Sequence, residues 1–591
     1  MTSNRKMSPI TWLILTLMGF YAGNIVSRPV RVSYIASHDV PAAINASLDA
    51  YKNPVPSMNR MDLIAGAATA AIVLLALLYH YSGQHVTRDG EEHGSAAWAS
   101  STDMRPYSDK NPGNTLLMTH SEALALDTYK TRRNLNVLVT GASGSGKTRG
   151  YVLPNMTNMA THHTPISLAI TDTKGEIHHQ TAEKMRKAGW RIKTFNLIDM
   201  ATSDHFNPLN YMNPDDPEGS LIRLADNIIT NTGANTKNHG DFWDKASKSL
   251  LTGLLAYTYF AEDPETRNMN TVMNMLGQMS ASESDPDQAS PIDDLMAETR
   301  AFIEDAEKSA DDYDGESLAM LEGLDFACSQ YRTYEQGPAE TRASIITTLA
   351  NQTAGLHARR IKTILDNDTM QLDQVGDKPT VIYIIISDTN QTFTYLASIF
   401  YQCLFETTMY KADHNASGAL TIPLHCMLDE FANIGKIPGF PILISTMRGR
   451  NMSVSVILQT ISQIKALYKD EWETITANCD SKLFLGGNDE TTTKWYSTIL
   501  GNQTIWTTST TENKGMNGSY SIQQSAQKRE LLTADELGRL DNAMCVYILR
   551  GLKPFYSRKL GWGERRCPGR NRGPCFPGSR YLNDTALLIK D

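Results

Sequence analysis

The chain carries a loop of small residues that ends in lysine and threonine, Gly141-Ala142-Ser143-Gly144-Ser145-Gly146-Lys147-Thr148. An apolar run over 135–139, typical of a buried strand, precedes it. Such a loop leaves backbone N–H groups free to converge on phosphate oxygens. In the pattern G-x-x-x-x-G-K-[ST], the lysine reaches the β- and γ-phosphates and the hydroxyl ligates Mg²⁺. We therefore predict that residues 141–148 bind ATP, with Lys147 on the phosphates and Thr148 on the metal.

A second motif lies far downstream, where an apolar strand over 424–428 ends in Asp429-Glu430. Asp429 is predicted to hold Mg²⁺, and Glu430 to orient and deprotonate the water that attacks the γ-phosphate. A strand that ends in Asp-Glu is also a common N-cap for the next helix, so the pair alone does not establish catalysis. Together with the phosphate loop, it predicts a nucleoside-triphosphate hydrolase.

Length and charge limit the possible architectures and partners. A chain of 591 residues is too long for one core and predicts two or three domains. The net charge of −9 is uneven, because residues 281–323 hold fourteen Asp and Glu against two Lys and Arg, which leaves +3 for the remainder. This charge balance does not exclude contact with DNA, but it argues against a broad basic face. None of the seven cysteines forms a C-x-x-C pair, so no zinc motif is present.

Two apolar stretches near the N-terminus, Ile10 to Val26 and Leu63 to Tyr81, have the length of membrane-spanning helices. A cleaved signal peptide is the alternative for the first stretch, since Arg5 and Lys6 precede it. An ATPase needs cytosolic nucleotide, so we predict a two-pass anchor with helices over about 10–27 and 63–81 and the remaining domains inside. The positive-inside rule opposes this topology, because four cations lie in the loop that it exports: Arg28, Arg31, Lys52 and Arg60.

Apolar strands alternate with helical patterns after the phosphate loop and predict an α/β fold with a mainly parallel sheet covered on both faces. The predicted strands are 167–172, 190–195, 380–386, 424–429, 453–458, 482–485 and 545–549.

Helical spacing without strand patterns characterises residues 262–370, where we predict an inserted all-α subdomain whose acidic segment is a solvated face. After Leu560 the chain becomes rich in Gly, Pro and Arg, which predicts a disordered tail; whether this tail binds nucleic acid is left open. The predicted organisation is an anchor over 1–82, a discontinuous nucleotide-binding domain over 83–261 and 371–560, the all-α subdomain over 262–370 and the tail over 561–591.

Several stretches resemble the TraG/TraD-like coupling proteins of conjugation and type IV secretion, and the resemblance covers most of residues 90–560. Asp429 and Glu430 lie in the most specific of them, MLDEFANIG at 427–435. Thr173 departs from the family pattern, which has proline there. The other stretches are HGSAAW at 93–98, the phosphate loop, ITDTKGE at 170–176, FNPL at 206–209, DFWDKA at 241–246 and RELLT at 529–533.

The resemblance implies a RecA-like P-loop motor that assembles as a homo-hexamer at the inner face of the bacterial cytoplasmic membrane. Such a motor recruits a relaxase bound to DNA and passes the complex to the type IV secretion channel, moving single-stranded DNA without sequence preference. Two alternatives share the fold: a septal translocase that moves double-stranded DNA in chromosome partitioning, and a protein-only secretion motor. Nothing over 561–591 resembles the DNA-reading domain of the septal class.

The resemblance also assigns roles to two further side chains. Gln459 stands where RecA-like motors place a polar sensor of the γ-phosphate, although it could instead cap the following helix. Arg448 is the candidate arginine finger that reaches a neighbouring subunit's nucleotide, with Arg450 as its rival and a plain surface charge as the alternative.

Overall fold

The computed structural model describes residues 9–82, 90–233, 241–281, 289–308, 313–390, 392–513 and 519–561. The chain divides into two units, one with residues 1–93 and 506–526 and the other with 94–505 and 527–591. The predicted tail lies outside the described residues from position 562 onward.

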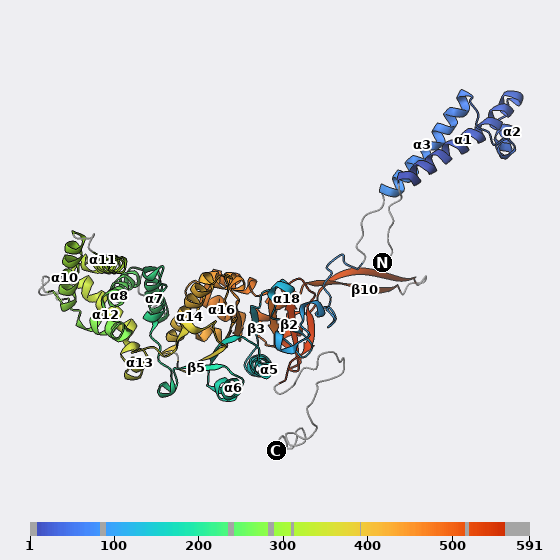
Figure 1. The fold of residues 1–591 in the computed structure, drawn as a ribbon. Helices are drawn as coiled ribbons and strands as arrows, with labels where there is room; N and C mark the ends of the chain where they lie inside the picture. The colour runs from blue at the N-terminus through green and yellow to red at the C-terminus, as the bar shows by residue number, and fades with distance from the viewer. Residues whose placement is uncertain are drawn as a thin grey trace, which may run out of the picture. The chain divides into compact units, whose positions relative to one another are not determined.

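The N-terminal unit contains two helices that are long and apolar enough to cross a membrane, and they are candidates for membrane anchoring. They are α1 (Pro9–Ser37) and α3 (Arg60–Ser82), with α2 (Val40–Asn45) between them (Figure 1). The predicted span over 10–27 lies within α1, which continues to Ser37, and the span over 63–81 lies within α3.

Glycines bring α1 and α3 into close contact. A Cβ on Gly23 would lie 2.3 Å from the Thr69 hydroxyl oxygen, and one on Gly66 would lie 2.8 Å from the Phe20 carbonyl oxygen. Small residues at such positions let helix backbones approach within van der Waals distance, which is how helices associate where lipid removes the hydrophobic driving force. The two helices therefore form one packed hairpin.

A partly buried ion pair links the two helices. Asp62 is fully buried and accepts hydrogen bonds from the Arg31 guanidinium at 2.9–3.1 Å and from the hydroxyls of Ser27 and Ser57 at 2.9 and 2.6 Å. A buried carboxylate needs such partners, because its desolvation is otherwise costly. One of the four cations in the predicted exported loop is thus neutralised inside the hairpin.

A nine-stranded sheet forms the centre of the second unit, in the order β13-β12-β9-β3-β8-β7-β4-β6-β5. The strands from β9 to β5 are parallel, while β12 and β13 are antiparallel and extend one edge. The predicted mainly parallel α/β sheet is confirmed. The bounds are β3 (Val137–Thr140), β4 (Ser167–Asp172), β5 (Arg191–Asn196), β6 (Thr380–Ile385), β7 (Leu424–Leu428), β8 (Met452–Leu458), β9 (Ser481–Phe484), β12 (Met544–Leu549) and β13 (Phe555–Arg558).

Alternate residues of these strands enter two separate cores, as a period of two requires. Val139 and Ile170 pack with α5 (Leu153–His162) and α6 (Glu176–Lys187) on one face. Leu138 and Ala169 enter the other core, which is formed with the helices of the opposite face. These are α14 (Thr394–His414), α15 (Phe440–Thr446), α16 (Ile461–Tyr468) and α17 (Trp472–Ala477). Helices on both faces explain why the inner parallel strands are almost continuously buried, while four of the six residues of the edge strand β5 are half-buried.

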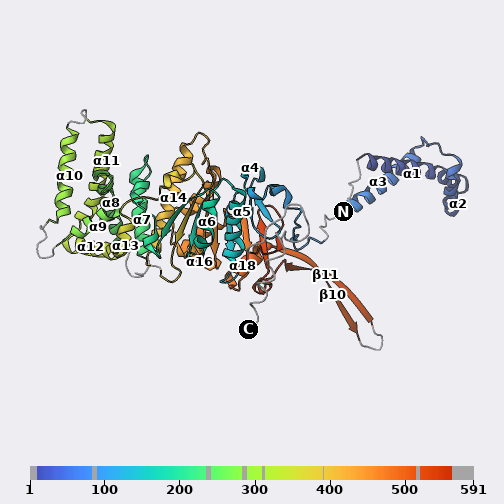
Figure 2. The ribbon, with the colours of Figure 1, turned by 60° about the horizontal axis from the view of Figure 1, so that its bottom comes forward.

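A run of helices lies between β5 and β6 and forms a lobe beside the sheet (Figures 1 and 2). The run begins at Pro217, ahead of the predicted insert at 262. Its first helix, α7, contacts both α14 of the sheet domain and α8 of the lobe. Sequence periodicity shows that such a segment is helical but not which neighbour it packs against. The helices are α7 (Pro217–Thr232), α8 (Asp241–Ala261), α9 (Met269–Gln278), α10 (Pro291–Glu307), α11 (Gly315–Glu335), α12 (Ala339–Thr353) and α13 (Arg359–Ile364).

Two additional antiparallel strand pairs were not predicted from the sequence. One joins β1 (Thr115–Leu117) to β2 (Ala123–Ala125), and the other joins β10 (Asn502–Asn513) to β11 (Ser519–Glu530). The long pair is rich in Thr, Ser and Gln, so it lacks the apolar alternation that predicts a strand. The remaining α-helices of the described residues are α4 (Thr128–Thr131), α18 (Glu490–Leu500) and α19 (Ala534–Gly538).

Candidate nucleotide site

The loop over 141–148 connects the carboxyl end of β3 to the helical turn that leads into α5. Gly144 and Gly146 have φ of +76° and +92°, the left-handed region that favours glycine, and no atom lies within 4 Å of a Cβ built at either position. The backbone N–H groups of Gly144, Gly146 and Lys147 donate to no protein acceptor in the described chain. The loop therefore presents free donors on an open surface, which is the arrangement that binds phosphate.

Lys147 places its ammonium group across the loop. Its side chain is only 7% exposed, and Nζ donates to the Gly141 carbonyl at 2.9 Å. The same Nζ lies 3.4 Å from Glu430 Oε1. The two motifs that were predicted separately are thus joined by an ion pair.

Thr148 and Asp429 lie side by side, as two ligands of one metal ion require. Thr148 Oγ1 donates to Asp429 Oδ2 at 3.0 Å, and Asp429 is 4% exposed. Burial, together with the charge of Glu430, raises the pKa of Asp429 to about 6. A divalent cation prefers hydroxyl and carboxylate oxygens of this kind and favours the ionised carboxylate. The pair fits Mg²⁺.

Glu430 occupies the left-handed region, with φ and ψ both 51°. A side chain larger than glycine is uncommon there, and such residues cluster at functional sites. Glu430 precedes a short helical turn over Phe431–Asn433, but its side chain makes no capping hydrogen bond. The capping interpretation is therefore not supported, and the carboxylate faces Lys147 instead.

The strand order explains how these residues meet. Because β8 lies between β3 and β7, the phosphate loop, Gln459 and the Asp429-Glu430 pair follow three neighbouring parallel strands at the same edge. Gln459 is half-buried, and its backbone N–H donates to the Gln463 side chain at 3.0 Å. The cap of α16 is Thr460, which forms a capping box with Gln463, so Gln459 is not the cap. Its role as a γ-phosphate sensor stays a prediction.

Arg448 and Arg450 precede β8 and therefore lie at the edge of the sheet opposite the phosphate loop. Arg448 is exposed and donates to the Thr128 carbonyl at 2.9 Å. Arg450 donates twice to Asp413, at 2.7 and 2.8 Å. A seven-residue strand is about 20 Å long, so neither guanidinium reaches the nucleotide site of its own chain.

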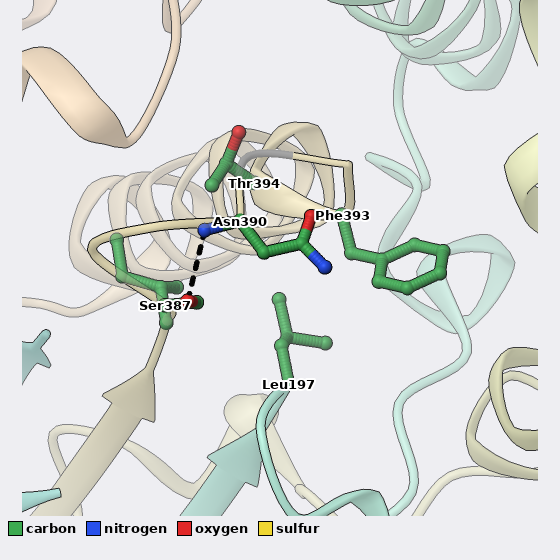
Figure 3. A pocket seen from close by; sticks show the side chains of 6 residues that line it. Leu197, Ser387, Asn390, Phe393 and Thr394 are labelled. Carbon is green, nitrogen blue, oxygen red and sulfur yellow. Dashed lines mark hydrogen bonds between the residues drawn. The ribbon is translucent and has the colours of Figure 1, made fainter. Parts of the chain in front are cut away.

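Two features of the edge that carries the phosphate loop were not predicted. Lys559, at the end of β13, donates to the Ser145 carbonyl of the phosphate loop at 2.8 Å, and no motif signals it. A cavity of about 20 Å³ lies beyond β5 and β6, where Leu197, Asn390 and Phe393 converge (Figure 3). The N–H of Asn390 donates to the Ser387 hydroxyl at 3.0 Å beside it. This volume holds about one water molecule, so the cavity is no second nucleotide site.

A family model described as "Type IV secretory system Conjugative DNA transfer" matches residues 98–571. The chain belongs to this family of coupling proteins. Family members function in conjugative DNA transfer through type IV secretion systems, so the sequence resemblance is confirmed.

The relatives agree with this membership. VirD4 of Rhizobium rhizogenes is 22% identical over 520 residues, which cover 84% of this chain and 69% of VirD4. A conjugal transfer protein TraG of Escherichia coli is 23% identical over 424 residues, covering 68% of this chain and 62% of TraG. The solved plasmid coupling protein TrwB, in complex with ADP and Mg²⁺, has the same fold, with a TM-score of 0.56 at 14% identity over 83% of this chain and 98% of TrwB.

Proposed function

We propose that the chain is a membrane-anchored ATPase that couples a relaxase–DNA complex to a type IV secretion channel and drives transfer of single-stranded DNA. The observation that carries this proposal is the meeting of Lys147 and Thr148 with Asp429 and Glu430 at one edge of the sheet. TrwB, which shares the fold, has been solved with ADP and Mg²⁺ and with the ATP analogue ADPNP, which supports both cofactors here.

The residues of the site have separate roles in binding and catalysis. The N–H groups of the loop and Lys147 would hold the phosphates of ATP, and Thr148 and Asp429 would hold Mg²⁺. ATP supplies a phosphoanhydride whose hydrolysis releases the free energy for transport. Glu430 then orients the attacking water and takes its proton, a role that its carboxylate can fill because it lies beside the loop and makes no capping bond.

The proposed location is the bacterial cytoplasmic membrane, with two spans and the ATPase in the cytoplasm. The packed pair of α1 and α3 supports a permanent anchor, because a cleaved signal peptide needs no glycine contacts with a second helix. A homo-hexameric ring is proposed with it; the position of Arg448, too far from the nucleotide site of its own chain, supports a role at the site of another subunit. The secretion channel and the relaxase are the proposed protein partners.

Lys147→Ala is expected to weaken ATP binding by at least about a hundredfold, because it removes a charge-assisted contact to phosphate from a desolvated position. Its removal also leaves the Glu430 carboxylate facing the phosphates without a counter-charge. Binding of a fluorescent ATP analogue to purified protein measures the effect. Lys187→Ala, which changes a lysine that is 76% exposed, is the matched control. ATP affinity that is equal in both variants would contradict the assignment.

Single-stranded DNA is expected to stimulate ATP hydrolysis by the protein in a salt-dependent way. Outside residues 281–323 the chain carries +3, and contacts with the DNA backbone release counterions, so stimulation should fall steeply between low and physiological salt. Backbone contacts carry no sequence information, so oligonucleotides of different sequence should act alike. Phosphate release with and without DNA is the measurement. A rate unchanged by DNA at low salt would favour the protein-only motor instead.

A further inference from the structure

Lys559 connects the last described strand to the phosphate loop. Besides its bond to the Ser145 carbonyl at 2.8 Å, its Nζ donates to Asn542 Oδ1 at 3.2 Å. The residue is half-buried, and its backbone N–H donates to the Ala543 carbonyl at 2.8 Å. Its ammonium group is therefore held in place from both sides and does not move freely in solvent.

Packing around the next residue fixes the position of Lys559 further. Leu560 is buried against Leu117 and Ala123. Its carbonyl oxygen lies 3.2 Å from the place where a Cβ on Gly150 would stand, two residues beyond the loop. The end of β13 thus lies directly against both the phosphate loop and the turn that follows it.

The bond to Ser145 orients the peptide that binds phosphate. In a trans peptide the C=O and the N–H point in opposite directions. Lys559 holds the C=O of Ser145, so the N–H of the same peptide, which belongs to Gly146, points the other way. That N–H has no protein acceptor in the described chain, and no atom lies within 4 Å of a Cβ built on Gly146. Fixing this peptide keeps the Gly146 N–H pointing toward the position where a phosphate oxygen would accept its hydrogen bond.

The charge of Lys559 supports the same assignment. No carboxylate of a described residue lies within 4.0 Å of its Nζ, whose acceptors are a carbonyl and an amide oxygen. A half-buried cation is stabilised by a nearby anion, because water screens it incompletely. A nucleotide bound on the loop would add negative charge on the far side of the peptide that Lys559 holds.

We propose that Lys559 is a positioning residue of the nucleotide site, which holds the Ser145–Gly146 peptide in the orientation that binds phosphate. This inference rests on the proposed ATPase function. It makes the C-terminal strand part of the site, so nucleotide binding and the position of β13 depend on each other.

The test compares Lys559→Met, Lys559→Arg and the wild type as full-length protein in detergent. Lys559→Met is expected to raise the Kd for ATP about tenfold, as expected for one hydrogen bond from a charged donor. It should raise KM more than it lowers kcat, because the catalytic carboxylate is unchanged. Lys559→Arg should restore most of the affinity, since it keeps the charge and the donors. Lys553→Met, at an exposed position on the same segment, should bind as the wild type does.

Melting without nucleotide and hydrogen exchange of residues 141–150 separate positioning from general stability. We expect an unchanged melting temperature for Lys559→Met and weaker protection of this peptide by added ATP. Equal Kd values for Lys559→Met and the wild type would overturn the inference alone. If Lys559→Met fails to fold, Lys559→Arg provides the test instead. A loss of ATP affinity in Lys559→Arg, at the melting temperature of the wild type, would also overturn the inference. Wild-type protein that binds no ATP would overturn the proposed function as well.

Discussion

Glu430→Gln is expected to bind ATP as well as the wild type does, or better, and to hydrolyse it at least about a hundredfold more slowly. The amide keeps the size and the backbone requirements of the glutamate at its left-handed position but cannot take a proton from water. The carboxylate lies 3.4 Å from Lys147 and competes with phosphate for the same ammonium group. Its neutralisation therefore leaves Lys147 more available to the nucleotide. Single-turnover hydrolysis and a separate binding measurement distinguish the two effects.

Glu183→Gln is a suitable control for this variant, because it neutralises a glutamate on the exposed surface of α6. Normal turnover in Glu430→Gln would remove Glu430 from the mechanism. A loss of ATP binding in the same variant would show that the Lys147–Glu430 ion pair is needed to hold the loop, and would assign Glu430 a structural role.

The centre of the site could be predicted from the sequence because local patterns determine it. A strand followed by a Gly-rich loop, and a strand followed by Asp429-Glu430, each specify their own geometry within a few residues. Parallel strands then bring their carboxyl ends to one edge of the sheet. What the patterns leave open is strand order. The position of β8 between β3 and β7, which places Gln459 between the two motifs, depends on pairing between distant segments.

Lys559 shows why the rest could not be predicted. It is a single lysine in an unremarkable segment, more than 400 residues from Ser145, and only the antiparallel pairing of β12 with β9 and β13 brings it to the loop. The strand β13 itself was not predicted, since only two of its four residues, Phe555 and Tyr556, are apolar and its residues alternate between buried and exposed. The proposed role of Lys559 depends on its contact with the Ser145 carbonyl, and no local sequence pattern encodes a contact between such distant residues.

Arg448 differs from Lys559, because the family resemblance predicted its role from the sequence. That role, an arginine finger, requires the nucleotide of a neighbouring subunit. It lies at the far edge of the sheet, tied by a single bond to the Thr128 carbonyl. Tyr129, the next residue, is 79% exposed, and Ile442, on the helix before Arg448, is 71% exposed. Apolar side chains exposed beside an arginine suit a surface that another copy covers. Arg450 is the weaker candidate, because Asp413 holds it with two hydrogen bonds.

Arg448→Ala is expected to reduce ATP hydrolysis by about a thousandfold, the lower end of the range for a missing arginine finger. Mixing it with Lys147→Ala should restore part of the activity. In a mixed ring, some interfaces combine the intact phosphate loop of an Arg448→Ala subunit with the intact arginine of a Lys147→Ala subunit. Neither protein alone contains such an interface. Phosphate release over a series of mixing ratios measures the recovery, which should pass through a maximum near equal amounts.

Arg450→Ala is the control, and it should retain hydrolysis because Arg450 is already engaged by Asp413. If Arg450→Ala instead loses activity and recovers on mixing with Lys147→Ala, Arg450 is the finger and Arg448 is a surface charge. Joint rings must be verified by co-purification of two differently tagged variants. In verified joint rings, recovery requires that the arginine act across the subunit interface, because each active site then draws its loop and its arginine from different chains. Failure to recover would exclude the trans role of Arg448.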